Sequence, residues 1–174
     1  MVTRPHLPAL DPLTWLPNRT LFEARLVRAV RDVERRRGTL ALLLIDLDRM
    51  EQVNATLGRG FGRRILREAA ARMARTLDAG ATLSRLQADD FAAFFEVEDL
   101  AAAAKRAGAL LERLREPYVV ECLALTVTAS IGIALHGPHG DGPAALLMRA
   151  ERALIHAKIR GRDRFYPDVT QPGS

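Results

Sequence analysis

The sequence has almost no cysteine, few aromatic residues and no long apolar run. Its single cysteine, Cys122, excludes an internal disulfide framework and is typical of proteins from a reducing compartment. Six Phe, two Tyr and one Trp leave Leu, Ala, Val and Ile to fill the core. Apolar runs such as residues 40–45 are too short to span a bilayer, and residues 1–10 lack the apolar stretch of a signal peptide. We therefore expect a soluble, cytoplasmic chain without direct membrane insertion, either free or part of a membrane-bound or multidomain protein.

The charge of the chain is positive, with a formal net charge of +5 and a pI of about 10.3. A basic chain can serve nucleic acid, an anionic membrane or a phosphorylated ligand. The densest arginine run, within residues 25–37, is typical of a solvated helix face. Few aromatic residues lie near this run, and the sequence offers no aromatic stacking platform for bases. Nucleic acid is therefore not an expected partner.

The pattern of apolar residues and turn signals predicts one α+β domain. The length of 174 residues suits a single domain. Four prolines make residues 1–17 an expected extended lead-in, and Asn18 is the expected N-cap of a first helix that ends at Gly38. The further elements expected are a buried strand over residues 39–46, helices around 61–73, 100–114 and 146–157, hairpins over 83–97 and 118–135, and an edge strand at 165–166. Helices that alternate with hairpins indicate a mostly antiparallel sheet with helices packed on its faces.

Several motifs follow one another in a fixed order. They read D-P-L-T-W-L-P-N-R at residues 11–19, D-L-D-R-M-E-Q-V-N at 46–54, R-L-Q-A-D-D-F at 85–91, A-S-I-G-I-A at 129–134 and A-K-I-R-G-R at 157–162. Taken together at these spacings, they resemble the GGDEF (diguanylate cyclase-like) domain family over residues 11–166, with residues 1–10 as a lead-in and 167–174 as a tail or linker. The resemblance implies a five-stranded, mostly antiparallel sheet flanked by helices, as in nucleotidyl cyclase and polymerase palm domains.

The resemblance also implies a site for a metal ion and a triphosphate. Mg²⁺ would be held by Asp46, the Leu47 carbonyl and Asp89, because magnesium prefers hard oxygen ligands and bridges to phosphates. Lys158 and Arg162 would contact the triphosphate, and their i, i+4 spacing near a helix C-terminus predicts that they project from one face. Acids at strand ends also pair with arginines in many proteins, and cations commonly stabilise helix C-termini, so these structural roles stay open here.

The signature segment departs from the family pattern. It reads Gln87-Ala88-Asp89-Asp90-Phe91, in which Asp89 and Asp90 would be the catalytic carboxylates. Two glycines of the family are absent, so we expect a tight turn with positive φ to be costly here. Asn54 matches the asparagine that reads the guanine edge, with a local cap or turn as its structural alternative. Arg63 stands where an aspartate would accept hydrogen bonds from guanine, and a guanidinium has no acceptor lone pair. Glu51 stands where a lysine would lie near the phosphates.

The retained phosphate residues and the lost guanine residues predict a degenerate GGDEF domain in bacterial cyclic di-GMP signalling. We expect a non-catalytic, regulatory module that retains weak binding of GTP, or of another nucleotide, together with Mg²⁺. Expected partners are a flanking or separate signalling domain, such as a phosphodiesterase domain, and a second copy in a homodimer. The alternative is an active, divergent diguanylate cyclase that converts two GTP to cyclic di-GMP, with Asp46, Asp89 and Asp90 carrying the metals and the developing charge.

Overall fold

The fold is organised around strand β1 (Thr39–Leu47), a nearly continuous apolar run with helices over both of its faces. The computed structural model describes residues 9–169. Strand β1 lies between β3 (Asp90–Val97) and β6 (Ala129–His136), both antiparallel to it, and β2 (Thr82–Gln87) and β7 (Arg164–Pro167) form the edges. Strand β2 is antiparallel to β3, whereas β6 and β7 are parallel. The prediction of a five-stranded, mostly antiparallel sheet is confirmed.

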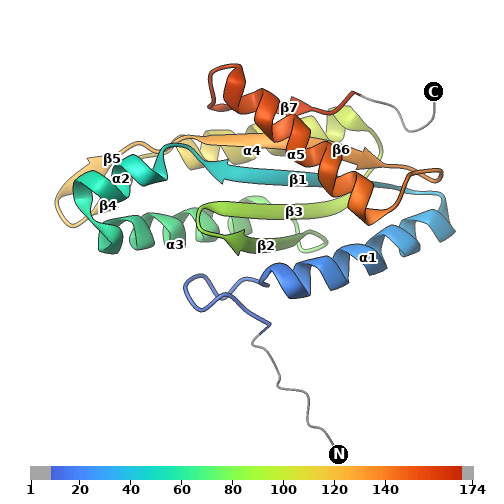
Figure 1. Ribbon diagram of the computed structural model, residues 1–174, viewed down its shortest axis with the longest axis horizontal. Helices are drawn as coiled ribbons and strands as arrows, with labels where there is room; N and C mark the ends of the chain where they lie inside the picture. Colours follow the sequence, from blue (N-terminus) through green and yellow to red (C-terminus); the bar gives the residue numbers. More distant parts are fainter. Residues whose placement is uncertain (1–8, 170–174) are drawn as a thin grey trace, which may run out of the picture.

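Each face of the sheet is covered by two helices (Figure 1). Helices α1 (Arg19–Arg36) and α5 (Pro143–Ile159) pack on one face, and α3 (Arg59–Thr76) and α4 (Leu100–Arg115) pack on the other. Because alternate side chains of a strand point to opposite faces, the run from Leu40 to Ile45 supplies both cores. Leu40, Leu42 and Leu44 join the α1/α5 core, and Ala41, Leu43 and Ile45 join the α3/α4 core.

The predicted start of α1 is confirmed, and its end differs in one detail. The Asn18 side chain accepts a hydrogen bond from the Leu21 N–H at 3.1 Å and so caps the helix. At the C-terminus the left-handed residue is Arg37, with φ 55°, and not the expected Gly38. The Gly38 N–H then donates to the Val33 carbonyl at 2.8 Å, which closes the last turn.

The prediction of an extended lead-in is wrong for the part that the structure describes. Residues 11–17 form a closed loop in which the Asp11 N–H donates to the Leu16 carbonyl at 2.8 Å. Leu10 and Pro17 pair as an isolated antiparallel bridge. The Asp11 carboxylate binds the N–H groups of Leu13 and Thr14, so a local side-chain contact overrides the extended tendency of the prolines. The rest of the predicted lead-in, residues 1–8, lies outside the described residues.

The segments around β1 and β6 hold two further corrections. A short helix that was not predicted, α2 (Met50–Leu57), separates β1 from α3. The second predicted hairpin, over residues 118–135, is in fact two units. Strands β4 (Tyr118–Val120) and β5 (Leu123–Leu125) pair only with each other within the described chain, while β6 enters the main sheet beside β1. Both features lie at the end of the sheet where β1 ends, and they shape the candidate site there.

Candidate functional site

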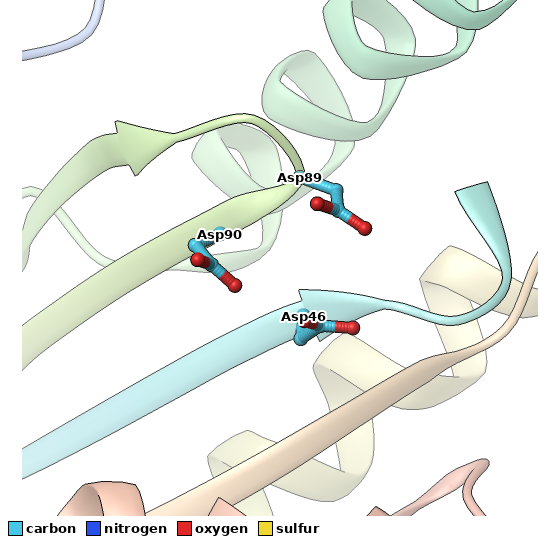
Figure 2. Close-up of side chains that lie close together, drawn as sticks. All are labelled: Asp46, Asp89 and Asp90. Carbon is cyan, nitrogen blue, oxygen red and sulfur yellow. The ribbon is translucent and has the colours of Figure 1, made fainter. Parts of the chain in front are cut away.

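Three carboxylates meet where β1 ends and β3 begins. Asp46 on β1 lies directly opposite Asp90 on β3 in the antiparallel register, and Asp89 lies in the turn just before β3. One oxygen of each of the three side chains lies within 4.8 Å of the others (Figure 2). The Leu47 N–H donates to the Asp89 carbonyl at 3.3 Å, which ties the turn to the strand end. Three hard oxygen donors at this spacing fit a divalent cation such as Mg²⁺.

Burial and the neighbouring carboxylates raise the pKa of Asp46 and of Asp89, so these two side chains hold protons more tightly than usual. Burial raises the pKa of Asp46 to about 7 against the lowering effect of the Lys158 ammonium, and the neighbouring Asp90 and Asp89 raise it further. Burial also raises the pKa of Asp89, with Asp90 adding to the effect. The Lys158 Nζ lies 2.6 Å from Asp46 Oδ2 and is the cation that balances the cluster in the described chain. A divalent cation at this site would therefore compete both with protons and with the lysine.

Lys158 reaches the acids because α5 packs very close to β6. A Cβ added at Gly132 on β6 would lie 2.2 Å from the Ala150 carbonyl oxygen, so only a glycine permits this approach. The prediction that Lys158 and Arg162 project from one face of the same helix is wrong, because α5 ends at Ile159, before Arg162. Arg162 lies in the following turn with a left-handed φ of 62°. Both side chains nevertheless line the same pocket, so the correction concerns the helix end and not their proximity.

The turn that carries Asp89 is strained and is held by an arginine from β2. Ala88 has a φ of 39°, in the left-handed region that favours glycine, so the expected cost falls on Ala88 and not on Gln87. Arg85 donates to the Ala88 carbonyl through Nε at 3.0 Å and through Nη2 at 2.5 Å. Its Nη1 binds both carboxylate oxygens of Asp11 at 3.0 and 3.1 Å. Arg85 thus connects the loop before α1 to the turn beside the acids.

Two pockets meet at the acidic cluster. A pocket of about 410 Å³ is lined by Asp46, Asp89 and Asp90 together with Lys158 and Arg162. These two cations with three acids form the half suited to a metal ion and phosphates. Sequence analysis predicted all five residues for this chemistry, and the structure brings them together.

The adjoining pocket, of about 450 Å³, contains the residues expected to meet a base. Its lining includes Asn54 and Arg63, the two residues expected to meet the base, together with Arg59 and Glu51. Asn54 is seated against Gly62, where an added Cβ would lie 1.9 Å from the Asn54 Oδ1. Arg63 lines this pocket, and its guanidinium can only donate hydrogen bonds. The two pockets share Met50, Glu51 and Asp89, so one elongated ligand can span both.

The comparisons with known proteins agree with this geometry. The family model described as "Diguanylate cyclase, GGDEF domain" matches residues 8–164. The chain belongs to the GGDEF family. A solved structure of the GGDEF domain of TpbB from Pseudomonas aeruginosa aligns with a TM-score of 0.88 and 35% identity, covering 91% of this chain and 94% of that chain. The structural neighbours of this GGDEF domain are therefore cyclase palm domains, as predicted.

Curated relatives of this GGDEF domain are longer than it is. The "bifunctional diguanylate cyclase/cyclic di-GMP phosphodiesterase" MucR of P. aeruginosa is 36% identical over 155 residues, 89% of this chain and 23% of MucR. The diguanylate cyclase TpbB of the same species is 38% identical over 154 residues, 87% of this chain and 35% of TpbB. The cyclic di-GMP phosphodiesterase PdeR of Escherichia coli is 28% identical over 155 residues, 89% of this chain and 23% of PdeR. The chain thus spans between about a quarter and a third of the length of these relatives.

Two features of this GGDEF domain were not assigned by sequence analysis. Arg85 and Asp11 both stand in the quoted motifs, but a contact between residues 74 positions apart leaves no local signal. Asp48 lies just beyond β1 and accepts hydrogen bonds from Thr128 Oγ1 and Ser130 Oγ, both at 2.7 Å. Asp48 therefore binds the start of β6 and does not join the three acids. Within residues 9–169, no helix is both long and apolar enough to cross a membrane.

Proposed function

We propose that this GGDEF domain is a regulatory module of cyclic di-GMP signalling that binds a magnesium nucleotide and has lost efficient cyclase activity. The observation that carries the proposal is that the phosphate pocket keeps the residues expected from the family resemblance, whereas the adjoining base pocket does not. The phosphate pocket keeps Asp46, Asp89, Lys158 and Arg162, whereas the base pocket presents Arg63 and a strained turn at Ala88. A ligand held mainly by its phosphates would bind with relaxed selectivity for the base.

In the proposed phosphate site, a metal ion would take the place of the Lys158 ammonium beside Asp46. Asp46 and Asp89, with the Leu47 carbonyl as a further ligand, would hold Mg²⁺, which would supply Lewis-acid chemistry to a bound phosphate. Lys158, which pairs with Asp46 in this structure, would donate to a phosphate once Asp46 holds a metal ion. Arg162, whose guanidinium has no ion-pair partner among residues 9–169, would take a second phosphate oxygen.

The base pocket argues against efficient synthesis of cyclic di-GMP. The Watson–Crick edge of guanine presents the N1–H and N2–H donors beside the O6 acceptor, and Arg63 presents only donors, so it leaves the two N–H groups of guanine without an acceptor. Leaving such groups unpaired costs about 1–3 kcal/mol each. Cyclic di-GMP synthesis also requires two domains to align their substrates closely, and small misplacements lower the rate strongly. Asn54 remains as a contact that every purine can use.

The names of the relatives support a signalling partner. MucR is named as both a cyclase and a phosphodiesterase, and PdeR as a phosphodiesterase, so similar domains occur in proteins with phosphodiesterase activity. We therefore include an attached or separate phosphodiesterase domain in the proposal, with a homodimer as the form in which the domain transmits its signal. The proposed location is the cytoplasm, where nucleotides are available.

One observation favours a second candidate function, an active and divergent diguanylate cyclase. The three carboxylates Asp46, Asp89 and Asp90 lie within 4.8 Å of one another despite the altered turn. Phosphoryl chemistry depends mostly on metal ions and on positioning, so such a cluster retains what the attacking and leaving oxygens need.

Product analysis with radiolabelled GTP and Mg²⁺ separates the two functions, with a proven cyclase as the positive control. We expect no cyclic di-GMP from this chain, and formation of cyclic di-GMP that is lost in Asp89→Asn would overturn the regulatory proposal. A parallel calorimetric titration tests binding: we expect Mg–GTP and Mg–ATP to bind with similar affinity in the millimolar range. Asp89→Asn should abolish this heat, while Asp141→Asn, a matched change at an exposed loop residue, should leave it unchanged. Absence of heat with either nucleotide would remove nucleotide binding from the proposal.

A further inference from the structure

A further groove adjoins the phosphate pocket and shares Arg49, Gln52 and Arg162 with it. It has a volume of about 550 Å³, within the range of small-molecule sites of about 300–1,000 Å³. Its walls come from α2, from the segment that joins β5 to β6, and from the turn between α5 and β7. No residue that lines the groove also lines the base pocket, so the groove lies outside the part of the site expected to meet a base.

The lining of the groove combines an apolar wall with two cations. Val53, Leu123 and Leu125 are among the aliphatic side chains of the wall, and Leu123 remains 44% exposed. Arg49 and Arg162 stand at the side shared with the phosphate pocket. A largely apolar pocket with a few convergent polar groups is the usual composition of a site for a small organic ligand.

The charges of the groove are unbalanced toward the positive. Its two acids are satisfied by other groups, because Asp48 accepts hydrogen bonds from Thr128, Ser130 and the Asp163 N–H, and Asp163 pairs with Arg115 at 2.7 Å. In contrast, over residues 9–169 neither the Arg49 nor the Arg162 guanidinium has an ion-pair or hydrogen-bond partner. The groove therefore presents two available cations beside an apolar surface.

The backbone around these cations is strained. Arg49 and Arg162 both have a φ of 62°, and Asp163 has a φ of 49°. Left-handed conformations cost a non-glycine residue about 1–2 kcal/mol each and tend to gather at ligand sites, where the surrounding structure holds them. Three such residues, Arg49, Arg162 and Asp163, line this one groove.

We propose that the groove binds a small amphipathic anion, with an apolar or aromatic body against Leu123 and Leu125 and an acidic group on Arg49 and Arg162. A bare phosphate would leave the aliphatic wall in water, and a neutral apolar molecule would leave both cations unused. A ligand here would share Arg162 with the phosphate pocket, so it would alter nucleotide binding at the adjacent site. This inference does not depend on whether the domain makes cyclic di-GMP.

Anilinonaphthalene sulfonate, which has an aromatic body and one sulfonate, is a suitable probe. We expect a saturable, one-site rise in its fluorescence with the folded chain, and at least about tenfold weaker binding to Leu123→Asp, the scale of one lost leucine contact plus a repelling charge. The matched control is Val119→Asp on the same hairpin, which is 72% exposed and lies outside the groove. Its affinity should stay within about twofold of the parent chain.

The charge requirement is tested with N-phenylnaphthylamine, an uncharged relative of the probe. We expect it to bind the parent chain more weakly than the sulfonate, and Arg49→Gln to remove this difference while the protein stays folded by circular dichroism. Equal loss of binding in both aspartate variants, or equal affinity for both probes, would overturn the proposal. A signal that falls at rising protein concentration as the chain dimerises would assign the groove to a second copy and also overturn it.

Discussion

Because the turn at Ala88 is strained, we expect an alanine-to-glycine substitution there to stabilise the fold, whereas this substitution usually destabilises a protein. Replacing an exposed alanine by glycine normally destabilises a protein, because glycine has more conformational freedom in the unfolded chain, at a cost of about 0.5–1 kcal/mol. Ala88, however, is exposed and has a φ of 39°. Relief of a left-handed conformation is worth about 1–2 kcal/mol. We therefore expect Ala88→Gly to stabilise the fold by about 0.5–1 kcal/mol.

Urea unfolding followed by circular dichroism measures this difference. With an m-value of about 2 kcal/mol/M, the midpoint of Ala88→Gly should rise by about 0.25–0.5 M at unchanged m. The Arg85 bonds to the Ala88 carbonyl involve only backbone at residue 88, so the substitution keeps them. No other contact of the turn needs to change.

The matched control is Ala109→Gly, at an exposed position in the middle of α4. Glycine in a helix interior costs about 1 kcal/mol relative to alanine, so its midpoint should fall by about 0.5 M. The same chemical change should thus give opposite shifts at the two positions. A fall of similar size in both variants would refute the assignment of strain to the turn.

Three further predictions concern the contacts around the site. Arg85→Met should lower the free energy of unfolding by about 2 kcal/mol. Breaking a fully buried ion pair costs about 3–5 kcal/mol and breaking an exposed pair costs about 0–1 kcal/mol. The Arg85–Asp11 pair lies between these cases, because its side chains are 12% and 17% exposed. Arg113→Met, which breaks an ion pair whose side chains are 52% and 50% exposed, should cost under about 0.5 kcal/mol in the same urea assay. Affinity for Mg²⁺, measured by calorimetry, should rise from pH 6 to pH 8 with proton release on binding, because the pKa of Asp46 is raised to about 7; a pH-independent affinity would contradict this. Between about pH 4 and pH 7 the metal-free folded state binds more protons than the unfolded chain, so the Asp46 contribution to stability falls as pH rises through that window. Finally, Arg63→Asp should raise the preference for Mg–GTP over Mg–ATP by about tenfold, the scale of one restored pairing, and an unchanged ratio would show that residue 63 does not read the base.

Features built from local sequence were predictable, and features built from distant contacts were not. Strand β1 and its terminal Asp46 follow from one continuous apolar run, and the Asn18 cap follows from its position before a periodic segment. Helix α2 was missed because it is short and because its N-cap, Arg49, is a left-handed residue that makes no side-chain cap. The β-rich segment over residues 123–135 carries no local signal for the point at which the chain leaves one sheet and enters the other.

The candidate site shows the same division. Its residues were found from their motifs, but the pairing of Lys158 with Asp46 was not, because the two residues lie 112 positions apart. The clamp from Asp11 through Arg85 to the Ala88 carbonyl was missed for the same reason, although each member stands in a quoted motif. Motifs therefore identified which residues matter, while their pairing required the fold.

The architecture explains why one half of the site can change while the other persists. Asp46 and Asp90 face each other because the β1–β3 register is set by buried apolar pairs such as Leu42 with Phe94 and Ile45 with Phe91, and not by the turn beyond them. Substituting the turn glycines therefore strains Ala88 but does not scatter the acids. The residues of the base pocket lie on α2, on α3 and on the turn itself, where the β1–β3 register does not constrain their identity. A chain of this fold can consequently lose selectivity for a base and keep a cluster able to hold a metal ion and phosphates.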